Sequence, residues 1–422
     1  MGLGVDDTVS PRVAQKMVRS GAFSSSFAEA SSQLVNLSDL CVSAERIRRA
    51  CSHVGHDRVE EQTQLQEAFL AKSLPEQRHG KPADVEPPEI ACVMADGGRY
   101  QVLDRRNRVA GKRSARKGEH WKESRIAVLA SMLGEQYDQD PHPQLPSALR
   151  YGAVAEKLSE IGKTGAKLDL DEANGEIERP PDGPATTESD EFPGPTLERR
   201  KVVASGQSWE EFGYLLASQA WYQGFAAAER KVFVSDGSAT IEKLQRTHFS
   251  GHTSVLDILH ALSYSLAAAR AVHDDEASAR RQYNNWAERI WQGRVREVVD
   301  ALKAHGQRIG EPPPDASSED PREVVRTSRV YYENHARRMD YPLYRRQGFP
   351  LTSSLMESTV KQVNRRVKGS EKYWSQNGGE AMLRLRADYL SDDNPMGDYW
   401  TRRFRRATGM RTYRRLAPAA PA

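Results

Sequence analysis

The chain has 422 residues, of which 38% are hydrophobic and 28% charged, and its length suggests two or three domains. No stretch approaches the roughly 18 apolar residues that a membrane span needs, and the N-terminus lacks the basic-then-apolar pattern of a signal peptide. These features exclude a helical membrane protein and favour a soluble protein of the cytoplasm. The three cysteines, Cys41, Cys51 and Cys92, fit neither a zinc site nor a disulfide framework. We therefore expect all three to be buried as small apolar side chains.

The net charge is only +3, but the two signs are segregated along the chain. Residues 99–125 carry ten Lys or Arg against three acids, residues 168–198 carry ten acids and one Arg, and residues 401–415 carry seven Arg and no acid. Clustered cations suit a polyanionic partner because they neutralise phosphates and release counterions. A solvated basic surface has the same composition, so charge alone leaves both interpretations open.

Residues 10–85 have the pattern of a helical region. Within it, residues 26–57 predict a helix, a short turn and a second helix, for which Ser43 has the chemistry of an N-cap. A helix-turn-helix DNA-binding motif has this form, as does an ordinary helical hairpin with solvated arginines. The residues expected to face inward are Val42, Ile47 and Ala50, and the basic residues near the start of the second helix are Arg46, Arg48 and Arg49.

A Pro- and charge-rich linker at 74–89 separates this region from a segment with strand patterns. Residues 90–96 form a short apolar run, which is typical of a buried strand, and the run ends at the carboxylate of Asp96. Two more strands are expected at 97–104 and 121–133, with an exposed basic loop between them at 105–120.

The segment 168–195 is acidic and rich in Pro and Gly, which predicts a loop outside the core. Residues 208–231 then have helical periodicity, and residues 231–238 predict a second buried strand that ends at a carboxylate, Asp236. Residues 253–272 begin as a strand and continue as a helix. Helical segments are expected after this at 277–306 and, beyond a Pro-rich acidic loop at 309–321, from 322 to about 390.

Three carboxylates form the candidate site. Asp96 and Asp236 each end a strand and precede a glycine, and Glu357 lies in a predicted helix. Carboxylates are hard oxygen ligands, and several of them together would hold Mg²⁺ or Mn²⁺. Taken singly, each also has the ordinary interpretation of a cap or turn residue. A basic stripe after Glu357 suits phosphate binding or a salt-bridged surface, and its members are Lys361, Arg365, Arg366 and Lys368.

The segments around these acids resemble DDE transposases of bacterial insertion sequences, in particular the ISKra-type family of the Mutator-like superfamily. The most specific similarity lies at 344–390, where Tyr-Arg, Gly-x-Pro, a small-residue turn, Glu, Lys-Gly and Trp-Ser follow in the family's order. The blocks VMADGGRYQ at 93–101 and VFVSDGSATI at 232–241 are similar to those around the first and second acids, and the whole similarity covers residues 9 to about 400. One departure is Thr352-Ser353-Ser354, where the family has Gly-Ser-Gly; a turn that relied on the conformational freedom of glycine would be strained here.

The resemblance implies an α/β (α+β) fold with a ribonuclease H-like core, in which helices flank a mixed sheet, together with a helical insertion and a preceding all-helical domain. The implied division of the chain is 1–86 for a helix-turn-helix-like DNA-binding domain, 87–274 for the first part of the catalytic core with an acidic disordered loop at about 168–198, 275–340 for the insertion, 341–400 for the last part of the core and 401–422 for a basic tail.

The resemblance also implies that Asp96, Asp236 and Glu357 are the catalytic residues and the ligands of Mg²⁺ or Mn²⁺ in a two-metal-ion mechanism. Asp257 and His260 match the family's Asp-x-x-His motif, and His260 is expected to contact DNA or to orient a ligand. The expected partners are double-stranded DNA, as transposon ends and target, and further copies of the chain in a homodimer or higher oligomer on the bacterial nucleoid, with no membrane. The other side chains expected to contact DNA are Lys361, Arg365, Arg366, Lys368, Arg402, Arg403, Arg405 and Arg406.

The implied function is metal-dependent cleavage of DNA at the transposon ends, which leaves a 3′-hydroxyl, followed by attack of that hydroxyl on target DNA. Two alternatives stay open. One is a decayed or domesticated transposase that only binds DNA, and the other is a metal-dependent nuclease without strand transfer.

Overall fold

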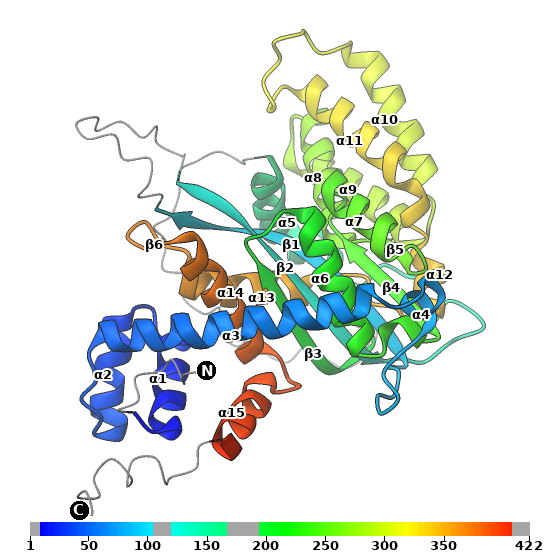
Figure 1. Ribbon diagram of the computed structural model, residues 1–422. Helices are drawn as coiled ribbons and strands as arrows, with labels where there is room; N and C mark the ends of the chain where they lie inside the picture. Colours follow the sequence, from blue (N-terminus) through cyan, green and yellow to red (C-terminus); the bar gives the residue numbers. More distant parts are fainter. Residues whose placement is uncertain (1–8, 104–119, 167–193, 407–422) are drawn as a thin grey trace, which may run out of the picture.

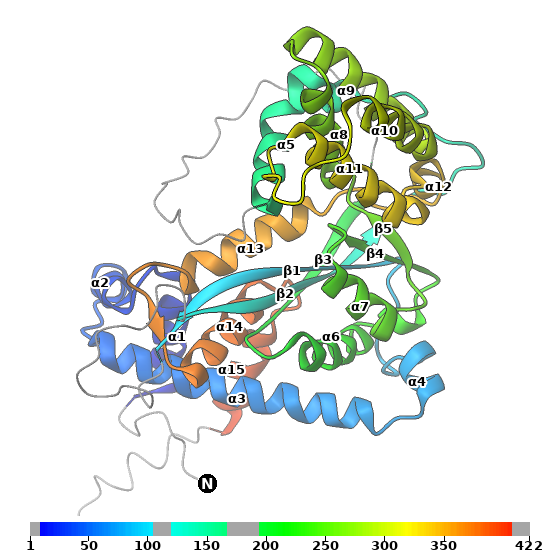
Figure 2. The ribbon, with the colours of Figure 1, turned by 90° about the horizontal axis from the view of Figure 1, so that it is seen from above.

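The computed structural model describes residues 9–103, 120–166 and 194–406 (Figure 1). A mixed sheet of six strands lies at the centre, and the content is otherwise mostly helical. The first two helices of the chain lie at one end of the sheet, a long helix runs from them past the sheet, and a second helical group lies at the other end (Figures 1 and 2). The expectation of a mixed α/β fold is therefore confirmed. The predicted basic loop at 105–120 and acidic loop at 168–195 lie almost wholly outside the described residues.

The sheet combines antiparallel and parallel pairing. Its order is β3-β2-β1-β4-β5, in which β1, β2 and β3 pair antiparallel, β4 and β5 run parallel to β1, and β6 pairs with the far end of β1. The strands are β1 (Ile90–Val102), β2 (Trp121–Leu133), β3 (Thr196–Ser205), β4 (Arg230–Ser235), β5 (Thr253–Leu256) and β6 (Tyr373–Trp374).

The first strand is longer than the sequence pattern suggests. The prediction that it ends at Asp96, with a separate strand at 97–104, is wrong, because β1 continues without interruption to Val102. Its partner β2 pairs straight across the Asp-Gly-Gly stretch, with Asp96 opposite Ile126 and Gly98 opposite Ser124. Cross-strand pairing with a long β2 outweighs the local turn preference of these residues.

Two layers of apolar side chains cover the two faces of the sheet. Ala91, Val93 and Ala95 belong to the cluster that packs against α6 (Trp209–Tyr222) and α7 (Ala239–His248). Cys92 and Met94 belong to the larger cluster on the other face. Because side chains alternate along a strand, Asp96 points to the same side as Cys92 and Met94.

Helix α3 (Ala44–Leu70) begins where the sequence predicts, whereas the segment expected as a linker at 74–89 begins with a short helix, α4 (Leu74–His79). Ser43 caps α3 through its side chain, which accepts a hydrogen bond from the Arg46 backbone N–H, and Ile47 and Ala50 are buried as expected. The third helix is 27 residues long and runs past the sheet to pack against α14 and α6 (Figure 1). The helices of this group are α1 (Pro11–Phe23), α2 (Phe27–Ser38), α3 (Ala44–Leu70) and α4 (Leu74–His79).

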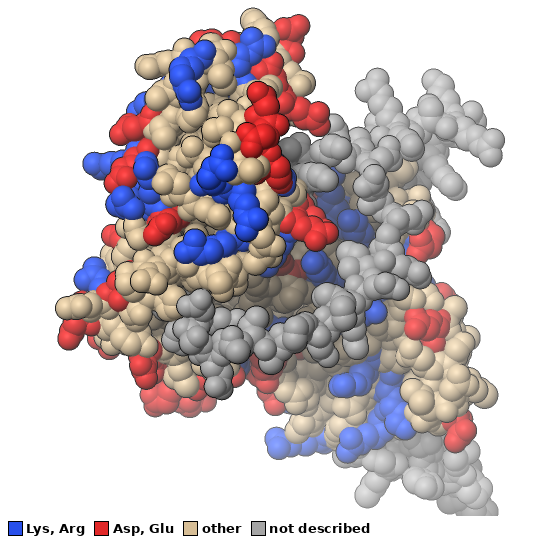
Figure 3. Space-filling view, turned by 180° about the vertical axis from the view of Figure 1, so that it is seen from behind, with Lys and Arg blue, Asp and Glu red and all other residues tan. Residues whose placement is uncertain are grey.

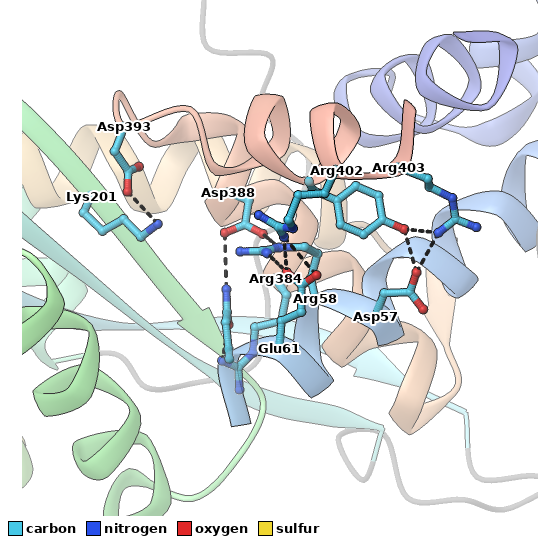
Figure 4. A network of polar contacts seen from close by, with 11 residues as sticks. Asp57, Arg58, Glu61, Lys201, Arg384, Asp388, Asp393, Arg402 and Arg403 are labelled. Carbon is cyan, nitrogen blue, oxygen red and sulfur yellow. Dashed lines mark hydrogen bonds and ion pairs between the residues drawn. The ribbon is translucent and has the colours of Figure 1, made fainter. Parts of the chain in front are cut away.

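Charged side chains join α3 to the C-terminal helices (Figure 4). Arg58 is buried and donates to the Asp388 carboxylate at 2.7 Å, and Gln62 donates to the same carboxylate. At the edge of this network, Arg402 pairs with Glu61. The N-terminal helices are thus attached to the core through buried charges as well as through apolar packing.

The second helical group contains the segment expected as an insertion. The helix predicted at 277–306 is two helices, because Gly293 has a φ of 73° between them, a conformation that favours glycine. Helices α8 and α11 pack side by side, and α5 packs on α8. The members are α5 (Tyr151–Ala166), α8 (Ile258–Val272), α9 (Glu276–Trp291), α10 (Val295–Ile309) and α11 (Pro321–His335), together with a short turn η3 (Ala336–Arg338).

The C-terminal part is helical, as predicted, and its first long helix links the two ends of the molecule. Figure 2 shows α13 running beside β1 and β2, from the second helical group at its start to α1 and α2 at its end. The helices are α12 (Tyr341–Arg346), α13 (Ser354–Val367), α14 (Gln376–Leu390) and α15 (Pro395–Arg406), and two further one-turn helices are η1 (Ser147–Leu149) and η2 (Phe225–Ala227).

Several expectations need correction. Helix α5 and strand β3 had no recognised signal in the sequence. The basic tail does not begin at residue 401, because helix α15 continues to Arg406. Cys51 and Cys92 are buried as expected, but Cys41 is exposed, because it lies in the short connection before α3. Within the described residues, no helix combines the length and the apolar character that crossing a membrane requires.

Candidate functional site

The first two acids stand level with each other on neighbouring strands. In the parallel pair of β1 and β4, Met94 lies opposite Val234. Every paired residue of β1 lies opposite the residue of β4 that is 140 positions later in the chain, as Ile90 lies opposite Arg230. Asp96 and Asp236 are also 140 residues apart and come two residues after the pair of Met94 and Val234. Val232 and Val234 face the same apolar cluster as Met94, so alternation points both carboxylates to the same side of the sheet.

The third acid comes to this side on helix α13. Glu357 lies in the first turn of α13, which packs on β1 and β2. Its backbone N–H donates to the carbonyl of Ser353 at 3.1 Å. Because Glu357 lies so near the beginning of α13, the placement of that helix start decides where its carboxylate lies.

The start of α13 is held by Asp257, which is completely buried. One oxygen of Asp257 accepts from the backbone N–H groups of Leu259 and His260, as the N-cap of α8. The other oxygen accepts from the backbone N–H of Ser353 at 2.6 Å and from its hydroxyl at 2.5 Å. One carboxylate therefore fixes two helix starts, those that carry His260 and Glu357.

This arrangement also settles how the turn before Glu357 forms without glycine. Ser353 has φ −98° and ψ 23°, which any residue can adopt, and the described non-glycine residues with positive φ are Asp39 and Asn394. Thr352 and Ser354 stand where the family has glycine, and neither has a positive φ, so their side chains do not strain the turn. Ser353, which matches the serine of the family pattern, donates its hydroxyl to Asp257.

The electrostatics of Asp96 show which charges surround it. Burial of its carboxyl, together with the charges of Asp236 and Glu357, raises its pKa to about 7, although the backbone N–H of Gly97 and the charge of His260 act in the opposite direction. Asp236, Glu357 and His260 are thus all near enough to Asp96 for their charges to act on it. These are the acids and the histidine that the sequence singled out.

The carboxylates are partly engaged with the backbone. Asp96 accepts from the N–H of Gly97 at 2.6 Å, and Asp236 accepts from the N–H of Ser238 at 2.9 Å. In the part of the chain that the structure describes, no three His, Cys, Asp or Glu side chains are arranged as a ready-made metal cluster. The donor set is nevertheless one that a hard divalent cation prefers, and crowded like charges around a carboxyl of raised pKa are what such a cation would relieve. The residues present therefore fit Mg²⁺ or Mn²⁺.

The basic stripe on α13 divides into exposed and buried members. Lys361, Arg365 and Lys368 are exposed. The expectation that Arg366 contacts DNA is wrong, because its guanidinium is buried, donates to the carbonyl of Gly21 at 2.7 Å and lies over the Phe27 ring. Seen from behind, the molecule is hollowed between the second helical group and the N-terminal part, and Lys and Arg side chains lie along this hollow (Figure 3).

The arginines of α15 are also unequal. Arg403 donates to Asp57 on α3 and is only 14% exposed, so it stabilises the junction of the two helices rather than presenting a free charge. Arg402 pairs with Glu61 and stays 46% exposed. Arg405 is exposed. The side chain of Arg406 lies outside the described residues.

A group on α8, α11 and η3 beside Asp236 was missed in the sequence. The Tyr331 hydroxyl donates to the carbonyl of Asp236 at 2.9 Å, and its ring stacks on Tyr264 with centroids 3.8 Å apart. His335 packs edge-on against Tyr331 and accepts from Arg338. Aromatic residues at helical spacing normally indicate core packing. Their position beside Asp236 could therefore be recognised only from the packing of α11 against the end of β4.

The chain matches no protein-family model, and the search of curated proteins returns no match.

Proposed function

We propose that this protein is a DDE-type DNA transposase that cleaves transposon ends and joins them to target DNA. The observation that carries the proposal is the placement of Asp96 on β1 and of Asp236 directly after the parallel neighbour β4, with Glu357 in the first turn of α13, which packs on β1. The charges of Asp236 and Glu357 both act on Asp96. Acids with unrelated structural roles have no reason to gather on one side of a sheet from positions 140 and 121 residues apart.

The fold supports a ribonuclease H-like core. Such a core, as the resemblance implies it, has a mixed sheet flanked by helices, with acids on the strands and on a late helix. Here the first acid lies on the central strand β1, the second directly follows β4, and the third opens α13. The helices α9 to α11 stand between the second and third acids in the chain, as expected of the helical insertion.

Asp96, Asp236 and Glu357 would hold the divalent ions. When bound, Mg²⁺ or Mn²⁺ supplies charge stabilisation for the attacking and leaving oxygens of an in-line phosphoryl transfer. The chain's part is to place the three carboxylates. Asp257 contributes by positioning, since it holds the helix starts that carry His260 and Glu357. The charge of His260 acts on Asp96, so this side chain would contact DNA or orient a ligand at the carboxylates.

The exposed cations of α13 supply the DNA-binding surface. Lys361, Arg365 and Lys368 follow Glu357 on the same helix, so DNA lying along them would present a phosphodiester to the acids. Replacing all three by Ala should weaken DNA binding for every sequence and lower the salt dependence by about 0.9 in the log–log slope for each phosphate that is no longer neutralised. If the slope of log affinity against log salt is unchanged in a filter-binding titration, α13 does not contact DNA.

The decisive experiment uses the DNA that flanks the gene, a target plasmid and Mg²⁺. The native protein should yield joined products, and Asp96→Asn, Asp236→Asn or Glu357→Gln should each abolish nicks and joined products while the gel shift of the flanking DNA persists. The matched control is Glu319→Gln, an exposed acid in the loop before α11, which should keep full activity. Nicks without joining would favour a nuclease, and a gel shift without cleavage would favour a DNA-binding relic.

A further inference from the structure

The residues directly after β4 form a tight turn that sets the direction of the Asp236 carboxylate. Gly237 has a φ of 96°, a conformation that L side chains rarely adopt. A β-carbon there would lie 3.1 Å from the His335 Nε2 atom and 3.3 Å from the Tyr331 ring. The turn is therefore enclosed by side chains from α11, which lies about 95 residues further along the chain.

A single hydrogen bond ties α11 to this turn. The Tyr331 hydroxyl donates to the backbone carbonyl of Asp236 at 2.9 Å. Its ring stacks on Tyr264, with an interplanar angle of 14°. Tyr264 lies four residues after His260 on α8, so the two project from the same face of that helix. The stack thus connects the turn at Asp236 with the helix that carries His260 to Asp96.

A second set of contacts supports the same turn. Arg338 donates to His335 Nδ1 at 2.7 Å and to the Ser235 hydroxyl at 3.4 Å. Because a guanidinium only donates, Nδ1 of His335 accepts, and in the neutral ring the proton lies on Nε2, the atom that faces Gly237. Arg338 thus reaches Ser235, Tyr331 reaches Asp236, and both His335 and Tyr331 limit the space at Gly237.

We infer that Tyr331 is a positioning residue of the carboxylate site: its hydroxyl, braced by Tyr264 and His335, holds the Asp236 turn in the conformation in which the Asp236 carboxylate would help to hold a divalent ion. The inference rests on the proposed function, because it assigns Tyr331 a role in the same metal site. It also assigns a role to the helices between the second and third acids, since α11 is one of them and its last residue, His335, lies beside this turn.

The chain offers a matched control at the next residue. Tyr332 is fully buried, and its hydroxyl donates to the carbonyl of Ala261 at 2.7 Å and lies 2.7 Å from the Ser265 hydroxyl, away from the acids. Tyr331→Phe and Tyr332→Phe each remove one hydroxyl from the same helix. Both should lower the melting temperature in EDTA, but only the loss of the Tyr331 hydroxyl should alter the site.

The test is a titration of the full-length chain with Mn²⁺. Electron paramagnetic resonance measures the free Mn²⁺, and the rise in melting temperature with added metal gives a second measure of binding. Tyr331→Phe should raise the Kd for Mn²⁺ roughly tenfold, as the removal of an outer hydrogen bond to a metal ligand does, and Tyr332→Phe should leave it at the native value. The cleavage deficit of Tyr331→Phe should be recovered at saturating Mn²⁺, which a general loss of folding would not allow.

The outcomes separate the two proposals. If the native protein binds Mn²⁺ through Asp236 and Tyr331→Phe binds it equally well, the role of Tyr331 is wrong and the proposed function stands. If the native protein and Asp236→Asn bind Mn²⁺ alike, the metal site and the inference built on it both fail. If Tyr332→Phe weakens Mn²⁺ binding as much as Tyr331→Phe, the effect is one of stability and the inference is overturned.

Discussion

The two helical groups at the ends of the sheet are joined to it in different ways. Helices α1 to α4 are attached through buried charge: Arg58 pairs with Asp388, and Arg366 donates to carbonyls at the end of α1. Helix α11 reaches the end of β4 through an uncharged donor, the Tyr331 hydroxyl on the Asp236 carbonyl, and the nearby Arg338 guanidinium lies at the longer distance of 3.4 Å from the Ser235 hydroxyl. The first junction is therefore expected to govern whether the protein folds, and the second to govern the geometry of the carboxylate site.

The physical reason lies in what each junction leaves behind when one partner is removed. A buried charge without its partner costs far more than a buried carbonyl that has lost one neutral donor. Substitutions at the N-terminal junction should thus act on stability, and substitutions at α11 should act on metal binding at modest cost in stability. Three changes would break or sharpen this contrast.

The largest effect is expected for Arg58→Ala. It leaves the Asp388 carboxylate buried without its cation, and should lower the free energy of unfolding by about 3–5 kcal/mol. Urea denaturation followed by tryptophan fluorescence measures it. Arg48→Ala on the same helix removes an exposed pair with Glu45 and should leave the midpoint unchanged. Equal midpoints for the two variants would mean that the buried pair does not hold the junction.

A smaller effect is expected for Arg366→Ala, about 2–3 kcal/mol, because two carbonyls, of Gly21 and Ser25, lose a charged donor. Its neighbour Arg365 is exposed, so Arg365→Ala should leave the unfolding midpoint unchanged and weaken DNA binding instead. Urea denaturation and a salt-dependent DNA titration of both variants measure the two properties. A stability loss in Arg365→Ala, or none in Arg366→Ala, would contradict the division of the α13 stripe.

The smallest effect concerns the site itself. The pKa of Asp96 is raised from 3.8 to about 7 in the folded chain. The folded state therefore holds this proton more tightly than the unfolded chain, and the stability of the metal-free protein should fall as pH rises through that window. Asp96→Asn removes the cost of burying an ionised carboxylate beside other acids. This variant should therefore be more stable than the native chain by about 1–2 kcal/mol at pH 8 in EDTA, once solvent screening is allowed for.

At pH 4 the advantage of Asp96→Asn should vanish, since the native carboxyl is then protonated as well. Adding Mg²⁺ at pH 8 should stabilise the native chain more than the variant, because the ion requires ionised ligands. Thermal unfolding with and without Mg²⁺ at the two pH values provides the measurement. A variant that is less stable than the native chain at pH 8 in EDTA would show that Asp96 is held by a favourable contact instead of like charge.

Local sequence determined much of the framework of this protein. A serine before a helical pattern is enough to start α3 at Ser43, because its side chain satisfies a backbone N–H that has no partner within the helix. Apolar runs of strand length indicated the positions of β1 and β4, and the acids Asp96 and Asp236 stood out beside them. Such signals act over a few residues, which is why they can be recognised without knowledge of the fold.

Tertiary structure decided what these elements do together. Arg365 and Arg366 are adjacent and chemically identical, yet one is exposed and the other is buried against carbonyls 345 and 341 residues away. Strand β1 passes through an Asp-Gly-Gly stretch with turn preference because β2 pairs with it throughout. The register of β1 on β4 makes Asp96 and Asp236 level, and the approach of α11 places Tyr331 on the second acid. Each of these features depends on a contact with residues far along the chain. The periodicity of a helix or strand indicates which of its faces is apolar, but it does not indicate which other element packs against that face.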